Sequence, residues 1–415
     1  MTEACVVGLG YIGLPTAAYM ARTGIRVHGV DIDPTVVTTV NEGRIHIVEP
    51  DLDGLVQKVV RDGALTAHPA PVPADVFLIA VPTPLGPDHA PVVDFVHAAA
   101  RAIAPVLRPG NIVILESTSP VGTTAEVARL LAAARPDLSI ATGEGKAEEI
   151  AVAYCPERVL PGRILVELVE NDRCVGGLTP DCAERAARFY ESFVRGAVLR
   201  TTAATAELVK LTENSFRDVN IAFANELSLV CDRLGPDVWE VISLANRHPR
   251  VNILRPGPGV GGHCIAVDPW FIVHSAPEQA RIIRTAREVN DGKARHVEEQ
   301  IARLAEAEPD APVICFGLAF KANVDDLRES PALEITERLA RRFPGRVMAV
   351  EPFVAALPRD LAALGVSLLG FEEALQRDGI WALLVDHSIF ARVAPAQRQG
   401  RRIVDTRGIW PGGAG

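Results

Sequence analysis

The fold is decided near the start of the chain by residues 4–31, ACVVGLGYIGLPTAAYMARTGIRVHGVD. The apolar run at residues 4–9 predicts a buried strand, and LPTAAYMARTG predicts a helix. Residues 26–31 predict a second strand that ends in an acid, Asp31. A strand, a glycine-rich turn, a helix and a strand in this order predict the first βαβ unit of a doubly wound α/β sheet.

The turn after the first strand has the pattern GxGxxG, in the residues Gly8-Leu9-Gly10-Tyr11-Ile12-Gly13. Gly8 permits a tight turn, Gly10 lets the backbone approach a pyrophosphate, and Gly13 lets helix and strand pack closely. The helix N-terminus offers free N–H groups and the positive end of its dipole to phosphates. We therefore predict a dinucleotide site at this turn, with Tyr11 and Ile12 among its contacts. The alternative is a tight turn without a ligand.

Asp31 lies 18 residues after Gly13, near the position where a carboxylate accepts hydrogen bonds from the adenosine ribose. A carboxylate there repels a 2′-phosphate, so NAD is favoured over NADP. Asp33 is the rival for this role, but it follows the strand and is expected to cap the next helix.

Two further strands end in hydroxyl side chains. Residues 75–81 (DVFLIAV) precede Thr83, and residues 111–115 precede Thr118. Ligands of open α/β sheets lie outside the carboxyl ends of the strands, so both threonines are placed to touch a cofactor or substrate. The alternative for each is a helix cap.

Composition and charge exclude several classes of protein. The 415 residues carry a net charge of −10, which argues against a nucleic acid or an anionic membrane as the main partner. A hydrophobic fraction of 48% is too high for a disordered chain. No apolar run is long enough for a membrane helix, and no signal peptide is expected. Seven scattered cysteines without a CxxC pair disfavour a disulfide framework or a zinc site and fit the cytoplasm.

The C-terminal third repeats the strand pattern without the glycine fingerprint. Residues 313–317, 346–351, 381–386 and 402–405 parallel the four strands of the first third. Between the two parts, Ala203–Leu234 has apolar residues at helical spacing and no Gly or Pro. We predict two Rossmann-like doubly wound domains joined by a long central helix. The expected division is an NAD-binding domain at 1–200, a central helical region at 201–300 and a second Rossmann-like domain at 301–415.

The central region carries a cysteine at the end of a glycine-rich loop. Residues 257–264 read GPGVGGHC, and Asp268 follows four residues after Cys264. Such a loop can wrap closely around a ligand, which favours an exposed, reactive thiol over the usual small buried side chain.

Two other groups of residues have the chemistry of an active site. Lys210 and Asn214 share one face of the central helix, where a cation and an amide can stabilise an oxyanion, although a solvated face is the alternative. Glu157, next to Arg158 in the segment CPER, offers a carboxylate that could orient a water or act as a general base.

Together these motifs resemble the UDP-glucose/GDP-mannose dehydrogenase superfamily, and within it most of all the UDP-N-acetyl-D-mannosamine dehydrogenases. The resemblance spans essentially the whole chain. It rests on GLGYIGLP (8–15), VPTP (81–84), ESTSPVGTT (116–124), YCPERVLPG (154–162), ELVKLTENSFRDVNIAFANE (207–226), GPGVGGHCIAVDPWF (257–271), FGLAFKANVDDLRESPALEI (316–335) and VDTRGIW (404–410).

The resemblance implies oxidation of the C6 alcohol of a nucleotide sugar to a carboxylate, with two NAD⁺ and no metal. Lys210, Asn214 and a water held by Asp268 would be near the first oxidation, after which Cys264 would attack the aldehyde. Water positioned by Glu157 and Thr118 would hydrolyse the resulting thioester. Implied NAD contacts are Gly8, Gly10, Gly13, Asp31, Thr83, Thr118 and Arg328. Implied UDP-sugar contacts are Glu157, Arg158, Lys210, Asn214, Arg250, Gly257, Gly261, Lys321 and Arg407. A homodimer is expected, with Arg250 reaching the neighbouring site.

Departures from the family pattern bear on the substrate. Pro161 stands where UDP-glucose enzymes have a second Glu, and Ala266-Val267 replaces their Pro-Lys. Both differences argue against UDP-glucose. Local chemistry does not separate the N-acetylmannosamine and N-acetylglucosamine epimers, so UDP-N-acetylglucosamine or another UDP-sugar is the alternative substrate. A non-catalytic NAD/UDP-sugar-binding protein is the alternative class, and it would be expected to have lost the cysteine, the lysine or the glycine loop.

Overall fold

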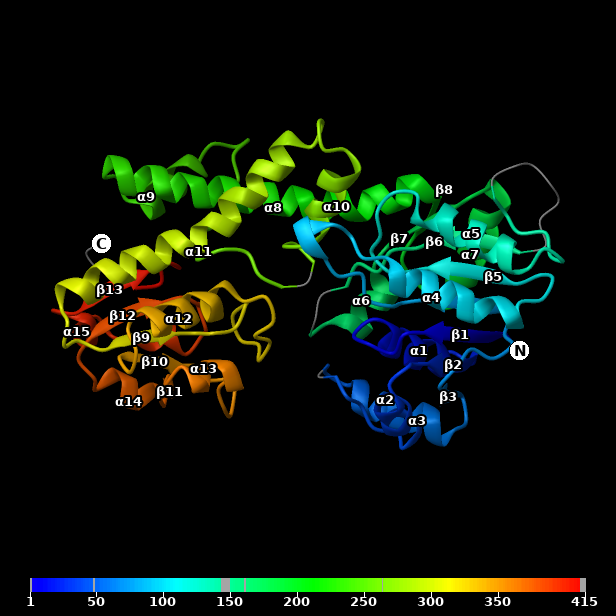
Figure 1. The fold of residues 1–415 in the computed structure, drawn as a ribbon, viewed down its shortest axis with the longest axis horizontal. Helices are drawn as coiled ribbons and strands as arrows, with labels where there is room; N and C mark the ends of the chain where they lie inside the picture. Colours follow the sequence, from blue (N-terminus) through cyan, green and yellow to red (C-terminus); the bar gives the residue numbers. More distant parts are fainter. Residues whose placement is uncertain (1, 48, 143–149, 160–161, 263, 411–415) are drawn as a thin grey trace. The chain divides into compact units, whose positions relative to one another are not determined.

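The computed structural model describes residues 2–47, 49–142, 150–159, 162–262 and 264–410 (Figure 1). The chain forms two compact units, Met1–Glu213 and Asn214–Gly415. Each unit contains its own sheet with helices packed on it, and the 32-residue helix α8 (Ala203–Leu234) crosses the boundary between them. The predicted fold class is confirmed, and the predicted central helix has the bounds expected from the sequence.

An eight-stranded sheet forms the centre of the first unit, with the order β3-β2-β1-β4-β5-β6-β7-β8. Neighbouring strands are parallel except for β6 and β7. The chain order reverses between β1 and β4, which is the point where open α/β sheets bind their ligands. The strands are β1 (Glu3–Val7), β2 (Arg26–Val30), β3 (Leu65–His68), β4 (Val76–Ile79), β5 (Ile112–Leu115), β6 (Ala151–Tyr154), β7 (Arg173–Gly177) and β8 (Val198–Thr202).

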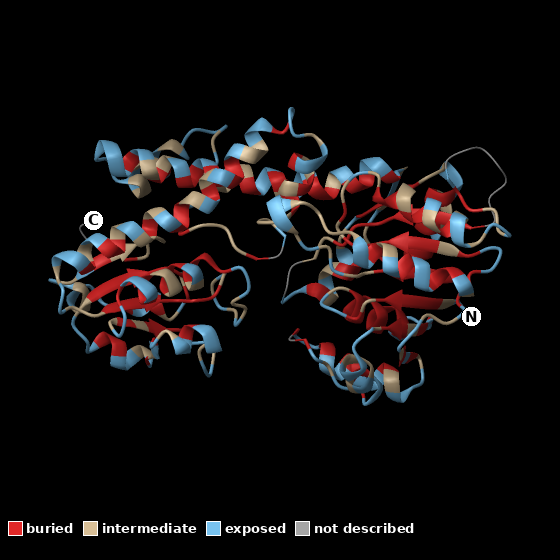
Figure 2. Ribbon diagram, in the orientation of Figure 1, coloured by how far each residue is buried: buried red, intermediate tan, exposed pale blue. Residues whose placement is uncertain are grey.

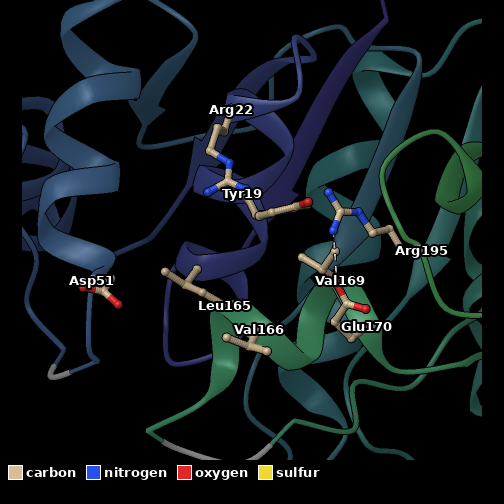
Figure 3. A pocket seen from close by; sticks show the side chains of 8 residues that line it. All are labelled: Tyr19, Arg22, Asp51, Leu165, Val166, Val169, Glu170 and Arg195. Atoms are coloured by element: carbon tan, nitrogen blue, oxygen red, sulfur yellow. Dashed lines mark hydrogen bonds and ion pairs between the residues drawn. The ribbon is translucent and has the colours of Figure 1, made fainter.

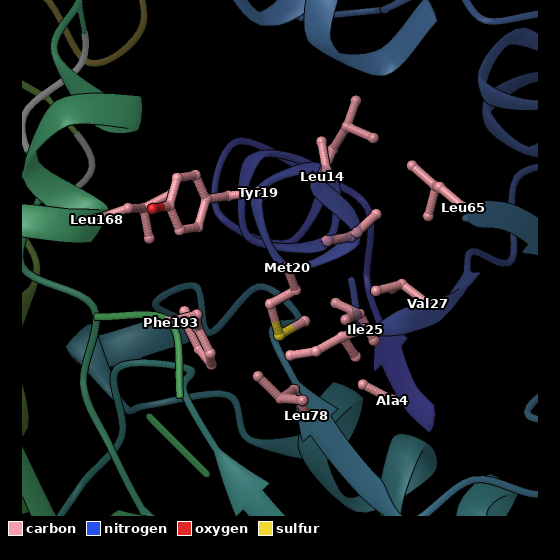
Figure 4. Close-up of a cluster of buried hydrophobic side chains, with 14 of the residues drawn as sticks. Ala4, Leu14, Tyr19, Met20, Ile25, Val27, Leu65, Leu78, Leu168 and Phe193 are labelled. Carbon is pink, nitrogen blue, oxygen red and sulfur yellow. The ribbon is translucent and has the colours of Figure 1, made fainter. Parts of the chain in front are cut away.

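Both faces of this sheet are buried, as a doubly wound fold requires. In β1, Ala4 and Val6 belong to one apolar cluster, while Cys5 and Val7 belong to the cluster on the other face. Figure 4 shows part of the first cluster, in which Met20 points from its helix toward Leu78. The helices of this unit are α1 (Gly13–Arg22), α2 (Pro34–Asn41), α3 (Leu52–Arg61), α4 (Asp94–Ile103), α5 (Thr123–Ala134), α6 (Ile164–Glu170) and α7 (Pro180–Glu191), with 3-10 turns η1 (Pro87–His89) and η2 (Ala104–Val106).

The second unit combines long helices with a five-stranded parallel sheet of order β11-β10-β9-β12-β13. Four of its strands are the ones predicted from the sequence. Figure 2 shows the strands of both sheets largely buried, with helices that alternate buried and exposed residues. After α8, the elements of the second unit are α9 (Val238–Ala245), α10 (Asp268–Ser275), α11 (Arg281–Ala307), β9 (Val313–Phe316), α12 (Pro331–Arg342), β10 (Val347–Val350), α13 (Arg359–Ala363), β11 (Ser367–Leu368), α14 (Phe371–Leu375), β12 (Ile380–Leu383), η3 (Phe390–Arg392), α15 (Pro395–Arg398) and β13 (Arg402–Asp405).

The two sheets share the geometry of their first turn. The N–H of Gly8 donates to the carbonyl of Val30 at 2.8 Å, and the N–H of Gly317 donates to the carbonyl of Val350 at 2.8 Å. Both glycines have positive φ, +96° and +94°. After the turn the two units differ: α1 begins at Gly13, but in the second unit the next helix, α12, begins only at Pro331.

Candidate functional site

The glycine turn of the first unit has room for a ligand at one position only. A Cβ atom at Gly8 would lie 2.5 Å from the carbonyl oxygen of Ala80, and one at Gly13 would lie 1.8 Å from the carbonyl oxygen of Gly8. A Cβ at Gly10 would meet nothing within 4 Å. Gly8 and Gly13 are therefore needed for the turn itself. Gly10 leaves open space at the N-terminus of α1, a kind of position that favours anions.

Asp31 fixes the same turn from the end of β2. Its Oδ2 accepts the N–H of Leu9 at 3.0 Å, and its Oδ1 accepts the N–H of Asp33 at 3.0 Å. Asp33 itself accepts the N–H of Thr35 at 2.7 Å and is the N-cap of α2, which confirms its predicted role as a cap. Asp31 is therefore the acid at the end of β2 that holds Leu9, the residue before Gly10.

Hydroxyl groups link the loops that follow β4 and β5. The Thr83 hydroxyl donates to the carbonyl of Thr118 at 2.6 Å, and the Ser117 hydroxyl donates to the carbonyl of Val81 at 2.7 Å. Thr83 therefore does not cap a helix. These bonds hold Thr83 and Thr118 together at the carboxyl edge of the sheet.

Glu207 of α8, which sequence reasoning missed, anchors this helix to the loop that carries Thr118. Its carboxylate accepts the N–H groups of Gly122 at 2.7 Å and Thr124 at 2.8 Å, and the Thr124 hydroxyl at 2.6 Å. These N–H groups belong to the start of α5, where an anion is stabilised. Lys210 lies three residues further along α8 with 9% of its surface exposed, so it is not on a solvated face. The ELVK motif indicated Lys210, but nothing in it indicated the partners of Glu207.

The segment after β6 carries Glu157 into a buried, charged environment. The Glu157 carboxylate pairs with Arg173 of β7 at 2.6 Å and accepts the N–H of Arg158 at 2.7 Å. The Arg158 guanidinium binds Glu213 at 2.7 Å and also donates to the carbonyl of Asp172. The side chain of Arg158 is thus used within the first unit, where it ties this segment to α8. The neighbouring Pro161 lies outside the described residues.

Glu116 and Tyr190 lie in the same buried region, and neither was predicted. The Tyr190 hydroxyl donates to Glu116 Oε1 at 2.6 Å. Burial, followed by the charge of Glu157, raises the pKa of Glu116 to about 7. Sequence reasoning placed residues 116–118 at a strand end but had no means to place α7 against it.

In the second unit, Cys264 stands apart from the other cysteines. It is exposed, whereas the other six are buried. Its carbonyl accepts the N–H of Val267 at 3.1 Å and of Asp268 at 2.9 Å, directly before α10. The buried Asp268 accepts a 2.5 Å hydrogen bond from the Asn214 amide. The structure therefore brings Cys264, Asp268 and Asn214 together, whereas His263 lies outside the described residues.

The glycine loop before Cys264 packs where side chains would collide. A Cβ at Gly261 would lie 2.4 Å from the carbonyl oxygen of Glu329, and one at Gly257 would lie 2.4 Å from the Arg407 guanidinium. The N–H of Gly257 donates to the buried Asn225 of α8 at 2.9 Å. Gly261 is thus required for the close approach of this loop to the backbone of Glu329, whereas at Gly257 the flexible end of Arg407 could shift.

Part of this loop lines a pocket of about 290 Å³ in the second unit. Lys321 and Arg407, both predicted to bind the UDP-sugar, line it together with Gly259. The Arg407 guanidinium is held by Asp386 at 2.9 Å. Residues that follow β9, β12 and β13 contribute to its walls, which places it at the carboxyl edge and switch point of the second sheet.

Glu351 and His387 hold the loop that carries Lys321. Glu351 Oε2 accepts the N–H of Leu318 at 2.7 Å, as Asp31 accepts that of Leu9 in the first unit. His387 Nδ1 accepts the N–H of Asn323 at 2.9 Å, and its Nε2 lies 3.0 Å from Glu351. Burial acts to raise the pKa of Glu351, but hydrogen bonds from His387 and Leu318 outweigh it and lower that pKa overall.

Two predicted arginines lie outside this pocket. Arg328 pairs with Asp326 at 2.6 Å, and Arg250 is exposed, with its N–H near His248 Nδ1 at 3.3 Å. A further pocket of about 290 Å³ in the first unit is lined by Tyr19, Arg22 and residues of α6, none of them predicted site residues (Figure 3).

Among the described residues, no group of three or more His, Cys, Asp or Glu could hold a metal ion. In the described part of the chain, no helix is long and apolar enough to cross a membrane.

Comparison with known proteins agrees with this geometry. Three models of the UDP-glucose/GDP-mannose dehydrogenase family match the chain: the NAD binding domain at residues 2–194, the central domain at 204–292 and the UDP binding domain at 314–412. The chain belongs to this family. It is therefore an NAD-dependent nucleotide-sugar dehydrogenase, with a UDP-sugar as substrate.

Individual relatives cover nearly the whole chain. An NDP-N-acetyl-D-galactosaminuronic acid dehydrogenase of Ralstonia nicotianae is 58% identical over 98% of this chain and 95% of its own. A UDP-N-acetyl-D-mannosamine dehydrogenase of Yersinia pestis is 54% identical over 98% of each. The solved structure of a UDP-D-ManNAc dehydrogenase from Pyrococcus horikoshii is 38% identical, with a TM-score of 0.85 over 98% of this chain and 96% of its own.

Proposed function

We propose that this enzyme oxidises the C6 alcohol of UDP-N-acetyl-D-mannosamine to the carboxylate, with two NAD⁺ per sugar. The observation that carries the proposal is Cys264. It is the exposed cysteine of the chain, it ends the glycine loop, and its carbonyl caps the turn that holds Asp268 against Asn214. A simple alcohol dehydrogenase needs no such thiol.

In the first oxidation, the alcohol loses a proton from oxygen and a hydride from C6. Bound NAD⁺ is the hydride acceptor in both oxidations. The proposal assigns Lys210, Asn214 and a water held by Asp268 to the substrate oxygen, where a cation and an amide stabilise developing negative charge. Arg250 and the glycine loop, including Gly257 and Gly261, would hold the sugar.

The second oxidation requires a covalent bond. An aldehyde has no C–OH from which a hydride can leave, so Cys264 Sγ adds to its carbonyl carbon and forms a thiohemiacetal. Loss of hydride from that carbon gives a thioester on Cys264. Water then bonds to the thioester carbon, the C–S bond breaks, and Glu157 takes the proton of the water while Thr118 orients it.

Most contacts of the substrate diphosphate and of the cofactor are assigned to different units. Lys321 and Arg407, on the walls of one pocket, fit a diphosphate, since both carry donors and positive charge. The Gly10 opening and Asp31 fit NAD in the first unit, and Arg328 is assigned to the same cofactor.

A second candidate substrate is a UDP-sugar of the N-acetylgalactosamine type. The Ralstonia relative named for an N-acetylgalactosaminuronic acid is 58% identical, against 54% for the Yersinia relative named for N-acetylmannosamine. These sugars share the N-acetyl group and the C6 alcohol, so the same reacting residues serve each of them.

We further propose a homodimer formed through α8. The proposed compartment is a reducing cytoplasm, which keeps the cysteines as thiols. Phe216, Phe223, Val230 and Leu234 are exposed at 69%, 56%, 44% and 73%, and their spacing of seven and four residues places them on one side of the helix. A stripe of this kind is covered by a second copy of the same helix, and Arg250 would then reach the partner's site. Sedimentation of F216S/F223S as a monomer would support this interface, and an unchanged dimer would refute it.

The deciding experiment counts NADH per mole of sugar with four substrates in parallel. These are UDP-N-acetylmannosamine, UDP-N-acetylgalactosamine, UDP-N-acetylglucosamine and UDP-glucose. Two NADH from the first alone supports the proposal, and two from the second alone supports the other candidate. Two from a different sugar keeps the chemistry and overturns the substrate. One NADH per sugar would remove Cys264 from the reaction.

A further inference from the structure

A buried arginine on β7 is the partner of Glu157. The Arg173 and Glu157 side chains are only 3% and 6% exposed, and Arg173 Nη1 lies 2.6 Å from Glu157 Oε2. Arg173 Nη2 also donates to the carbonyl of Leu168 at 3.1 Å. The other carboxylate oxygen of Glu157 accepts the N–H of Arg158. Both oxygens are therefore held in fixed directions.

Other ionisable groups approach the pair from neighbouring elements. The Arg173 guanidinium lies 5.6 Å from the centre of the Tyr190 ring of α7, and Tyr190 in turn binds Glu116 after β5. Burial raises the pKa of the Cys155 thiol to about 12, so it is neutral. Burial acts to lower the pKa of Arg173, but the charge of Glu157 outweighs it, and Arg173 stays protonated. Arg173 is thus the cation between two carboxyl groups, Glu157 and Glu116.

Stability alone does not account for this arrangement. Burying an arginine and a carboxylate costs more than an apolar pair of similar size unless every polar atom is satisfied. Among the described residues, Arg173 Nε and Glu116 Oε2 have no hydrogen-bond partner. A buried and incompletely satisfied charge cluster beside a reacting carboxylate points to a role in its chemistry.

We propose that Arg173 is a positioning residue for thioester hydrolysis, which pairs with the Glu157 carboxylate and keeps it aimed at the attacking water. This inference rests on the role of Glu157 in the proposed function. In that step, a carboxylate that is already protonated cannot take the proton of the water.

The test compares the pH dependence of hydrolysis in R173M with that of the wild-type enzyme. Each enzyme receives enough UDP-sugar and NAD⁺ for one turnover, and the reaction is quenched at intervals. The amount of Cys264 thioester is then measured by mass spectrometry at pH values from 5.5 to 9. In R173M, we expect the acid limb of the hydrolysis rate to move up by about one to three pH units, since that is the effect of one adjacent cation on a carboxylate.

A second variant, R173K, serves as the conservative control and guards against misfolding of R173M. Lysine retains the positive charge but lacks the planar guanidinium with its fixed N–H donors. The acid limb of R173K should therefore stay near that of the wild type, while its rate of thioester hydrolysis falls severalfold. A structural role would lower the amount of folded enzyme without moving either limb.

The inference is overturned if R173M keeps the wild-type limb or if R173K hydrolyses at the wild-type rate. A separate outcome identifies failure of the proposed function itself. If E157Q hydrolyses the thioester normally, or no Cys264 adduct forms in the wild type, both the inference and the role of Glu157 fall.

Discussion

Replacing Glu116 by Gln should make the enzyme more stable at neutral and alkaline pH. Glu116 is 3% exposed, and its Oε2 has no partner among the described residues. A glutamine keeps the volume and keeps an oxygen that can accept the Tyr190 hydroxyl at the observed 2.6 Å. The substitution therefore removes a buried, ionisable proton and little else.

The expected size follows from the pKa of Glu116. It rises from 4.5 to about 7, first through burial and then through the charge of Glu157. Because the pKa is higher in the folded protein, the neutral carboxyl favours folding fully below pH 4.5. This stability is lost as the pH rises through 7. At about 1.4 kcal/mol per pH unit, the total loss is about 3 kcal/mol.

The assay must report on the first unit. The four tryptophans are residues 239, 270, 381 and 410, so their fluorescence follows the second unit. Native-state hydrogen exchange of the β5 and β6 amides, measured from pH 5.5 to 8.5, reports the opening free energy of the strands that hold Glu116 and Glu157. The stability of E116Q minus that of the wild type should grow by about 2 kcal/mol across this range. A difference that is constant with pH, or that shrinks, would refute the reasoning.

Other predictions concern the reacting thiol and the two ligand sites. C264A should bind NAD⁺ normally by calorimetry yet form uronate more than about a thousandfold more slowly, and normal uronate formation would contradict the thioester. G10A should unfold in urea with wild-type stability, since its Cβ points into open space, but it should bind NAD⁺ at least about tenfold more weakly. G13A should lose about 2 kcal/mol or more of unfolding free energy, because its Cβ would meet a carbonyl oxygen. K321M should raise KM for the UDP-sugar about 10- to 100-fold with kcat little changed, and an equal fall in kcat would reassign Lys321 to the reaction.

The sequence predicted elements whose signals are local. The central helix was predicted at Ala203–Leu234, as observed, because neither Gly nor Pro interrupts its apolar periodicity. Strand ends were less exact: the run 75–81 was predicted, but β4 covers Val76–Ile79. At the carboxyl edge, the chain leaves the sheet to form the ligand loops, although its residues remain apolar.

The parts of the site that sequence reasoning missed depend on contacts across the chain. Glu207 meets Thr124 over 83 residues, Glu351 meets His387 over 36, and Arg173 meets Glu157 from a different strand. No spacing rule predicts these pairs, since each exists only once the sheet order is fixed. The reacting residues occur in compact motifs, but the residues that hold them do not.

The comparison of the two glycine turns explains why one chain can hold two different nucleotides. Gly8 and Gly317 make the same turn, and an acid at the end of the next strand holds the following N–H in both units. In the first unit α1 begins five residues after Gly8, so its N-terminus follows the turn directly and Gly10 leaves open space beside it. In the second unit residues 318–330 intervene before α12, and Ala319 stands where Gly10 would be. The start of α12, Pro331 and Ala332, also lines the pocket there, and side chains add positive charge. Lys321 and Arg407 on the pocket walls supply it.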